Sequence, residues 1–154
     1  MGSRKKQRKG LTIDGPFIPI THKVQDSAAY ISLTGNAAKM YNRIIRVART
    51  VAVKLGVPTE NDVQFDFTYS EAKKYGFSES TTRRALKELW DKGFISVIKI
   101  GGITASDKCG RMSSKYKLCG NWQSYGDTWK DRRNHEDDPW AARSEPKRDE
   151  APRW

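Results

Sequence analysis

Hydroxyl and cationic side chains gather between residues 78 and 87, where the single acid is Glu79. An Arg side chain can donate two parallel hydrogen bonds to guanine, and Ser and Thr hydroxyls can reach base edges or phosphates. Contact with double-stranded DNA is the chemistry that these side chains suit. The candidate DNA-contacting residues in this stretch are Ser78, Ser80, Thr81, Arg83, Arg84 and Lys87.

An amphipathic helix over about residues 79–92 would present those side chains. At about 100° per residue, one side of this helix is apolar, and Ser80, Arg84 and Lys87 fall on the opposite side. Ser78 is the expected N-cap, and Gly93 is the expected residue after the C-terminus. The apolar side, which should face a core, consists of Thr82, Ala85, Leu86, Leu89 and Trp90.

A shorter helix is expected just before it, beginning at Tyr69. Thr68 and Glu71 have the spacing of a capping box, in which each side chain accepts a hydrogen bond from the other residue's backbone N–H. Ala72 is small enough for a close helix crossing, and Gly76 can adopt the positive φ that ends a helix. Two helices joined by so tight a turn indicate a helix-turn-helix.

A β-hairpin is expected after the helices. Residues 94–100 are rich in β-branched side chains, residues 115–118 alternate in polarity, and residues 65–67 form a short third strand. The loop of about residues 101–114 is glycine-rich and polar, which fits a wing along a phosphate backbone or in the minor groove. The candidate DNA contacts of this hairpin are Lys108, Arg111, Ser113 and Lys115.

The order of a helix, an Ala-x-x-x-Gly turn, a helix ending in Leu-Trp-Asp-Lys-Gly-Phe-Ile and a two-stranded wing resembles the winged helix-turn-helix DNA-binding families of bacteria, phages and mobile elements. The resemblance covers roughly a third of the chain. Residues 17–34 also resemble the lead-in of phage and plasmid replication or regulatory proteins. The resemblance to the winged helix-turn-helix families implies an α+β fold. This fold is mainly a helical winged helix-turn-helix domain with a small antiparallel β wing, flanked by disordered tails. The resemblance also implies recognition by residues 78–87 and 108–115.

The longest helical pattern begins after Thr34, an expected N-cap, and runs to about Leu55. Its apolar residues extend beyond one stripe, so the helix is either central in the core, which we expect, or offers residues 40–53 to a homodimer. Its basic side either contacts phosphates or is an ordinary solvated face. The cations on that side are Lys39, Arg43, Arg46 and Lys54, and residues 56–62 are expected to form a loop.

The net charge of +11 is unevenly placed along the 154 residues. Residues 11–120 hold 17 cations against 10 acids, whereas residues 121–154 hold seven against eight. Such an excess favours a polyanion partner, since clustered cations release counterions from nucleic acid, and an anionic membrane surface is the competing partner. Residues 1–15 form a basic flexible arm that either tracks DNA or is only a solvated tail. The cations of the arm are Arg4, Lys5, Lys6, Arg8 and Lys9.

We expect one domain over residues 16–120 and a mostly disordered, aromatic-containing tail over residues 121–154. Trp122, Tyr125 and Trp129 are spaced three and four residues apart, which is typical of a helical turn. This turn either packs back onto the domain or anchors a partner protein such as replication machinery.

No arrangement of residues in the chain indicates catalysis, a cofactor or a metal. Cys109 and Cys119 lack CxxC spacing, and neither His22, in an expected extended lead-in, nor His135 has a partner that would make it a base or a ligand. The chain has no apolar run long enough to span a membrane, so we expect a cytoplasmic protein with reduced thiols. The residues leave open whether the two cysteines pair.

The sequence therefore predicts a DNA-binding protein that is not an enzyme. We expect sequence-directed binding of double-stranded DNA in replication initiation or transcriptional control of a phage, plasmid or other mobile element. The alternative is a winged-helix module or adaptor for protein–protein interaction that binds nucleic acid only nonspecifically. The target sequence, the oligomeric state and the choice between replication and transcription stay open.

Overall fold

The computed structural model describes residues 16–101, 113–127 and 138–140. These residues form an α+β fold with a three-stranded antiparallel sheet and two short 3-10 helices. The helices are α1 (His22–Gln25), α2 (Ala28–Ile31), α3 (Gly35–Leu55), α4 (Tyr69–Lys74) and α5 (Glu79–Asp91), with 3-10 turns η1 (Glu60–Asp62) and η2 (Asn121–Ser124). The strands are β1 (Gln64–Asp66), β2 (Ile95–Lys99) and β3 (Lys115–Leu118).

The sheet has the strand order β1-β3-β2, so the last strand lies between the other two. Phe65 pairs with Tyr116, and both side chains are buried, because alternate residues of each strand face the helices. Asp66 pairs with Lys115 on the opposite, exposed face. The three predicted strands are confirmed, each within a residue or two of the expected bounds.

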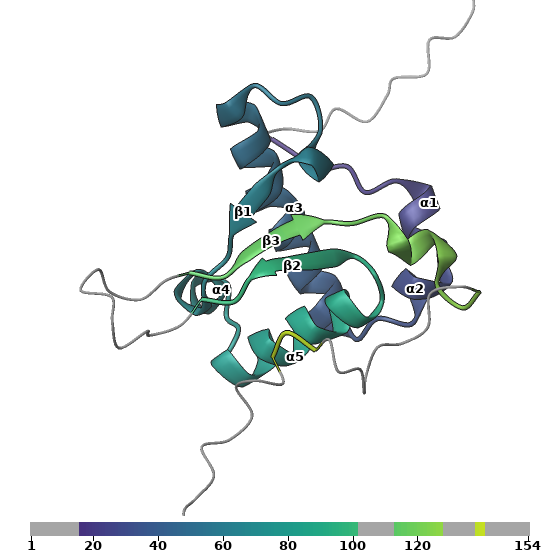
Figure 1. Cartoon of the computed structure of the whole chain (residues 1–154). Coiled ribbons are helices and arrows are strands. Elements are labelled where there is room, and N and C mark those ends of the chain that lie inside the picture. The colour runs from purple at the N-terminus through teal and green to yellow at the C-terminus, as the bar shows by residue number, and fades with distance from the viewer. Residues whose placement is uncertain (1–15, 102–112, 128–137, 141–154) are drawn as a thin grey trace, which may run out of the picture.

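Helix α3 is the central helix of the domain and lies behind the sheet in Figure 1. Thr34 is its N-cap and accepts a hydrogen bond from the Ala37 backbone N–H, as the sequence predicts. The helix buries Met40 and Ile44 completely, at about 1.5–3 kcal/mol for each side chain of this size. Core burial also decides against most of the candidate dimer surface, because Met40, Ile45 and Ala52 of that surface are inside the fold. Val53 is exposed.

Helices α4 and α5 are joined by a tight turn, and one of the two hydrogen bonds of the predicted capping box is present among the described residues. Thr68 Oγ1 accepts a hydrogen bond from the Glu71 backbone N–H, and Gly76 has a φ of +84° after the last turn of α4. The Phe77 N–H donates to the Ala72 carbonyl across this glycine, which satisfies a carbonyl at the helix end. The predicted start of α4 at Tyr69 and of α5 after Ser78 is confirmed.

Helices α1 and α2 and the turn η2 gather at one end of the sheet, whereas β2 ends and β3 begins at the other end (Figure 1). The lead-in before α3 is therefore not extended throughout, and His22 is the first residue of α1. The predicted loop over residues 56–62 also contains the turn η1. Helix α1 and the turn η1 are each a single turn, which is too short for an apolar period to show in the sequence.

Two segments beyond residue 120 pack onto the domain. The Trp122 ring stacks on Phe94 at 6.0 Å between centroids, and the Trp140 ring meets Trp90 edge to face at 5.9 Å. Trp140 is 8% exposed. The packed part of the chain therefore extends past the expected boundary, and three described aromatic side chains of the tail, Trp122, Tyr125 and Trp140, pack onto the domain.

Candidate nucleic-acid interface

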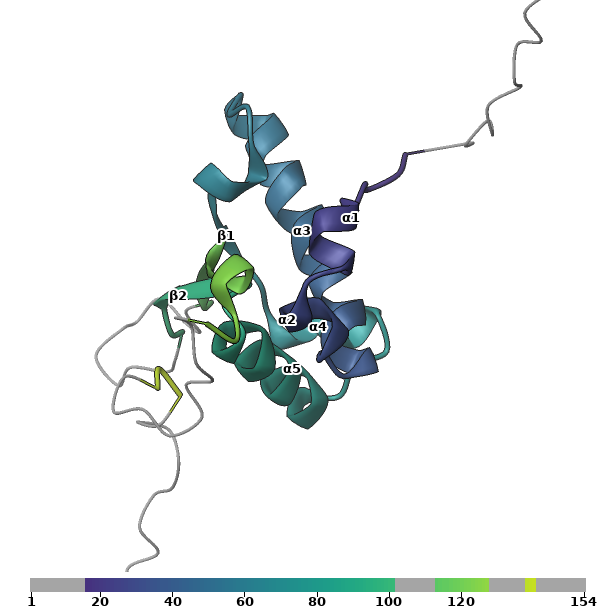
Figure 2. The same cartoon turned by 90° about the vertical axis from the view of Figure 1, so that its right-hand side faces the viewer.

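The first turns of α5 carry the exposed polar residues that the sequence singled out. In Figure 2 this helix runs along the lower side of the domain, away from α1. Its buried side is the predicted one: Thr82, Ala85, Leu86, Leu89 and Trp90 all belong to the core. Glu79, Ser80, Arg83 and Arg84 are exposed. The buried side of α5 is fixed by packing against the core, so the opposite side of the helix faces solvent.

Ser78, Ser80 and Thr81 form a connected set of hydroxyls at the N-terminus of α5. The Ser78 Oγ accepts a hydrogen bond from the Thr81 backbone N–H at 3.2 Å and donates to Thr81 Oγ1 at 2.8 Å. Ser80 Oγ lies 3.2 Å from Ser78 Oγ. Ser78 therefore caps the helix, and Ser80 is an exposed hydroxyl in its first turn.

Arg83 and Arg84 differ in how firmly they are held. Arg83 lies 3.9 Å from the Glu79 carboxylate, one turn away. A hydrogen bond to the Tyr69 side chain, and then the charge interaction with Tyr69, raise the pKa of the Arg83 guanidinium, with a smaller contribution from Glu79. No described carboxylate pairs with Arg84, which projects from the exposed side of the helix. Among the described ion pairs, Arg84 is thus the cation of α5 without a carboxylate partner.

Lys87, the last predicted contact on α5, already has an acidic partner. Its Nζ lies 2.7 Å from Asp138 Oδ2, and the Asp138 side chain is only 10% exposed. Asp138 belongs to the tail that the sequence predicts to be mostly disordered, so this pairing was not expected. Lys87 is half-buried as a result, in contrast to the two arginines before it.

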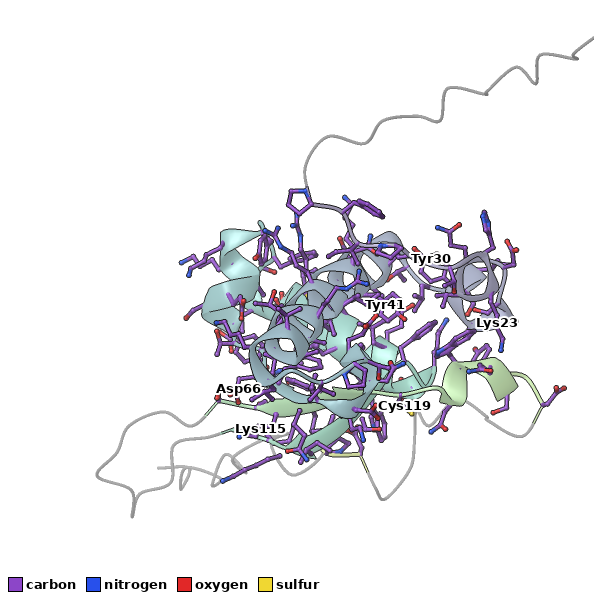
Figure 3. The ribbon with its side chains drawn as sticks, turned by 90° about the horizontal axis from the view of Figure 1, so that it is seen from above. Lys23, Tyr30, Tyr41, Asp66, Lys115 and Cys119 are labelled. Atoms are coloured by element: carbon purple, nitrogen blue, oxygen red, sulfur yellow. The ribbon has the colours of Figure 1, made fainter. Side chains whose placement is uncertain are left out.

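The end of the sheet next to residues 101 and 113 holds the described part of the expected wing. Ser113 Oγ donates a hydrogen bond to Asp66 Oδ1 at 2.8 Å, and Lys115 is exposed beside Asp66 (Figure 3). Ser114 Oγ accepts from the Gly101 N–H at 2.9 Å and so joins the two strands. The remaining predicted contacts lie outside the described residues: Lys108 and Arg111 of the loop, and Arg4, Lys5, Lys6, Arg8 and Lys9 of the arm.

Two lysines that the sequence analysis left out share the outer face of the sheet with Lys115. Lys99 is the cross-strand neighbour of Lys115, and Lys117 lies two residues along the same strand. The two-residue spacing of Lys115 and Lys117 could have predicted this, because side chains two residues apart on a strand face the same way. The described outer face thus carries three lysines near a single acid, Asp66.

The last turn of α5 holds a buried charge network that fixes the helix. Lys92 Nζ donates to the Ser32 carbonyl at 2.6 Å and to Ser32 Oγ at 2.7 Å, and it lies 3.7 Å from Glu88 Oε1. The Glu88 carboxylate accepts from the Thr34 N–H at 2.8 Å and from Thr34 Oγ1 at 2.7 Å. The four-residue spacing of Glu88 and Lys92 predicts an ion pair between them. Their other partners, Ser32 and Thr34, lie far away in sequence and could not be predicted from this spacing.

Within the described ranges, no group of His, Cys, Asp and Glu side chains could hold a metal ion. Cys119 is a free thiol, and Cys109 lies outside the described residues. No described helix combines the length and the apolar character needed to cross a membrane. Comparisons of the chain with family models, curated protein sequences and solved structures found no match. The chain's own geometry is therefore the basis on which its function is inferred.

Proposed function

We propose that the chain is a winged helix-turn-helix protein that binds double-stranded DNA rather than an enzyme. The element order α3-β1-α4-α5-β2-β3, with β3 between β1 and β2, supports the winged arrangement. In this proposal the N-terminal half of α5 enters the major groove, which admits one helix. The sheet end around Lys115, with the loop between β2 and β3, follows the phosphate backbone.

The observation that carries this proposal is the division of α5 into two sides. Its buried side is packed against α3 and α4, while Ser80, Arg83 and Arg84 are exposed together within two turns. A helix held from behind presents its outer side chains in a fixed geometry, as base reading requires. Replication initiation and transcriptional control of a mobile element are the two roles that we propose for such binding.

The first test is a selection of bound sequences from a random duplex pool at near-physiological salt. Binding of the selected duplex and of a scrambled duplex is then measured for Arg84→Ala. Loss of one bidentate base contact should weaken selected-duplex binding by about five- to 100-fold and scrambled-duplex binding much less. Lys23→Ala, at the far end of the domain from Asp66 and Lys115 (Figure 3), is the matched loss of one exposed cation. Equal losses on both duplexes would contradict base reading by Arg84.

Replication and repression differ in whether the tail is needed. A bare repressor should function without it, whereas recruitment of other proteins should require it. Removal of all residues after 120 would also remove Trp122, which stacks on Phe94 in the core. A chain ending at residue 127 keeps that contact and is the better variant for this comparison.

A protein-interaction module is the second candidate, and one observation favours it. The segment of residues 138–140 rests on α5, with Trp140 against Trp90 and Asp138 on Lys87. This flank of the helix therefore accommodates a tryptophan and an acid from a peptide. Enrichment of no duplex in the selection, with weak binding that vanishes as salt rises, would favour this second function.

A further inference from the structure

A second basic surface lies on α3, apart from α5 and the sheet. The segment of residues 16–18 and the turn of residues 75–77 enclose a pocket of about 790 Å³ against the outer side of α3. Five cations line it, and no Asp or Glu is among the described lining residues. The cations are Lys39, Arg43, Arg46, Arg49 and Lys54. We call this pocket the α3 groove.

The cations of the α3 groove form a row along the helix. At about 100° per residue they share one side of α3, and Lys39 and Lys54 are about 22 Å apart at 1.5 Å per residue. None of the five forms an ion pair with a carboxylate in the part of the chain that the structure describes. An unneutralised row of this length favours an extended polyanion over a single small anion.

Aromatic side chains flank the row. The Phe17 side chain is 61% exposed, although it lines the groove. The Arg43 guanidinium lies over the Tyr75 ring, 4.3 Å from its centroid, so one cation of the row contacts an aromatic side chain. An exposed ring costs free energy in water, and a stacked nucleobase would cover it while the neighbouring cations contact phosphates.

We propose that the α3 groove binds a short single strand of nucleic acid. Cations contact its backbone, and Phe17 stacks on a base, which is the combination used for single strands without sequence preference. The bases of a duplex are already paired and stacked and cannot reach Phe17. An acidic peptide would satisfy the cations but offers a flat group only where it carries an aromatic residue, whereas every nucleotide carries a base. The proposal stands on the α3 groove alone and does not depend on duplex recognition by α5.

The test uses the full chain and a labelled oligothymidylate of about 12 nucleotides, with affinity read from fluorescence anisotropy. Arg46→Gln with Arg49→Gln should weaken binding at least about tenfold and lower the salt slope by about 1.4, at about 0.7 for each phosphate contact. Lys73→Gln with Lys74→Gln removes the same charge from exposed positions of α4 that do not line the groove. This control should lose less than about twofold.

Stacking is tested separately from charge. Phe17→Ala should weaken binding of the oligothymidylate by about fivefold or more and leave an abasic strand of equal length unaffected, since only the former has bases to stack. Oligodeoxyuridylate and oligouridylate of the same length differ only in the sugar, so their comparison identifies which sugar the groove prefers, and binding of either strand supports the proposal. Arg84→Ala should leave all these affinities unchanged, so the duplex and single-strand proposals can fail independently.

Three results would overturn the proposal. The first is an equal loss of oligothymidylate affinity in the Arg46 and Arg49 variant and in the Lys73 and Lys74 variant, which would show that only the net charge matters. The second is displacement of the oligothymidylate by polyglutamate as effectively as by unlabelled oligothymidylate. The third is an equal loss of duplex and single-strand binding in the Arg46 and Arg49 variant. Circular dichroism checks folding, and Lys39→Gln with Lys54→Gln, two exposed positions, replaces that variant if it does not fold.

Discussion

Lys87 and Asp138 form an ion pair of 2.7 Å that joins the middle of α5 to a segment near the C-terminal end of the described chain. One turn further along the helix, Trp140 packs on Trp90. The two contacts reinforce each other, because the buried ring holds the carboxylate against the lysine. The flank of the proposed recognition helix is therefore covered by the chain itself.

Neutralising Asp138 should increase duplex binding if α5 enters the major groove. In Asp138→Asn the Lys87 ammonium is released from its carboxylate and can contact a phosphate. The pair is partly buried, because the Asp138 side chain is only 10% exposed. A contribution on the order of 1 kcal/mol gives an expected gain in affinity of up to about fivefold in a duplex titration. Asp127→Asn makes the same charge change at an exposed position and should give a smaller gain. An equal gain from both variants would show that only the net charge matters.

Gly93→Ala should destabilise the fold strongly. Gly93 has a φ of +81°, and a Cβ atom there would lie 2.8 Å from the Asn121 Cβ and from the Trp122 backbone nitrogen. The backbone strain alone costs about 1–3 kcal/mol, and the clash with η2 adds to it. Gly56→Ala has a similar φ of +66° and no atom within 4 Å of the added Cβ, so it isolates the strain. Urea unfolding should show the larger loss for Gly93→Ala, and equal losses would contradict the close approach of η2.

Glu88→Ala should lower the free energy of unfolding by about 1–3 kcal/mol, because it removes the acceptor for two hydrogen bonds from Thr34 and a partner of buried Lys92. Glu79→Ala is the matched control on the same helix. The Glu79 side chain is 68% exposed and its pair with Arg83 is 3.9 Å long, so we expect a change below about 0.5 kcal/mol. Similar values in thermal or urea unfolding would mean that the network contributes little.

Tyr41 should make the fold sensitive to alkaline pH. Burial, followed by the charges of Tyr30 and Glu60, raises the pKa of Tyr41 from 10.0 to about 12. Below pH 10 the phenol is protonated in both states, and between pH 10 and 12 the unfolded state loses its proton first. Stability should therefore fall by about 1.4 kcal/mol per pH unit in that range.

Tyr41→Phe is the control for this pH dependence, because it keeps the ring that lies 4.8 Å from Phe94 but has no titrating group. The difference in unfolding free energy between the two proteins should be independent of pH below 10 and should change steadily above it. A constant difference up to pH 12 would show that the phenol does not titrate with a raised pKa.

The local sequence predicted the elements whose determinants are close together in the chain. Ser78 and Gly93 delimit α5 by capping, and the 3.6-residue period of Ala85 and Leu89 identifies its buried side. The contact between Lys92 and Ser32 could not be predicted in this way, since it depends on how α5 and α2 are brought together. The composition of the tail suggested that it is unstructured. Composition cannot show that one acid of this tail, Asp138, pairs with Lys87 on α5.

The anchoring of α5 at its last turn has a consequence for how the protein can change. Lys92, Glu88 and the close approach of η2 to Gly93 hold that end of the helix, whereas exposed Ser80 and Arg84 contribute few contacts to the core. Substitutions at these exposed positions carry little folding cost. The exposed front of α5 can therefore vary while the packed part of the domain stays the same, and the proposed binding preference should be changeable there by selection or design without rebuilding the domain.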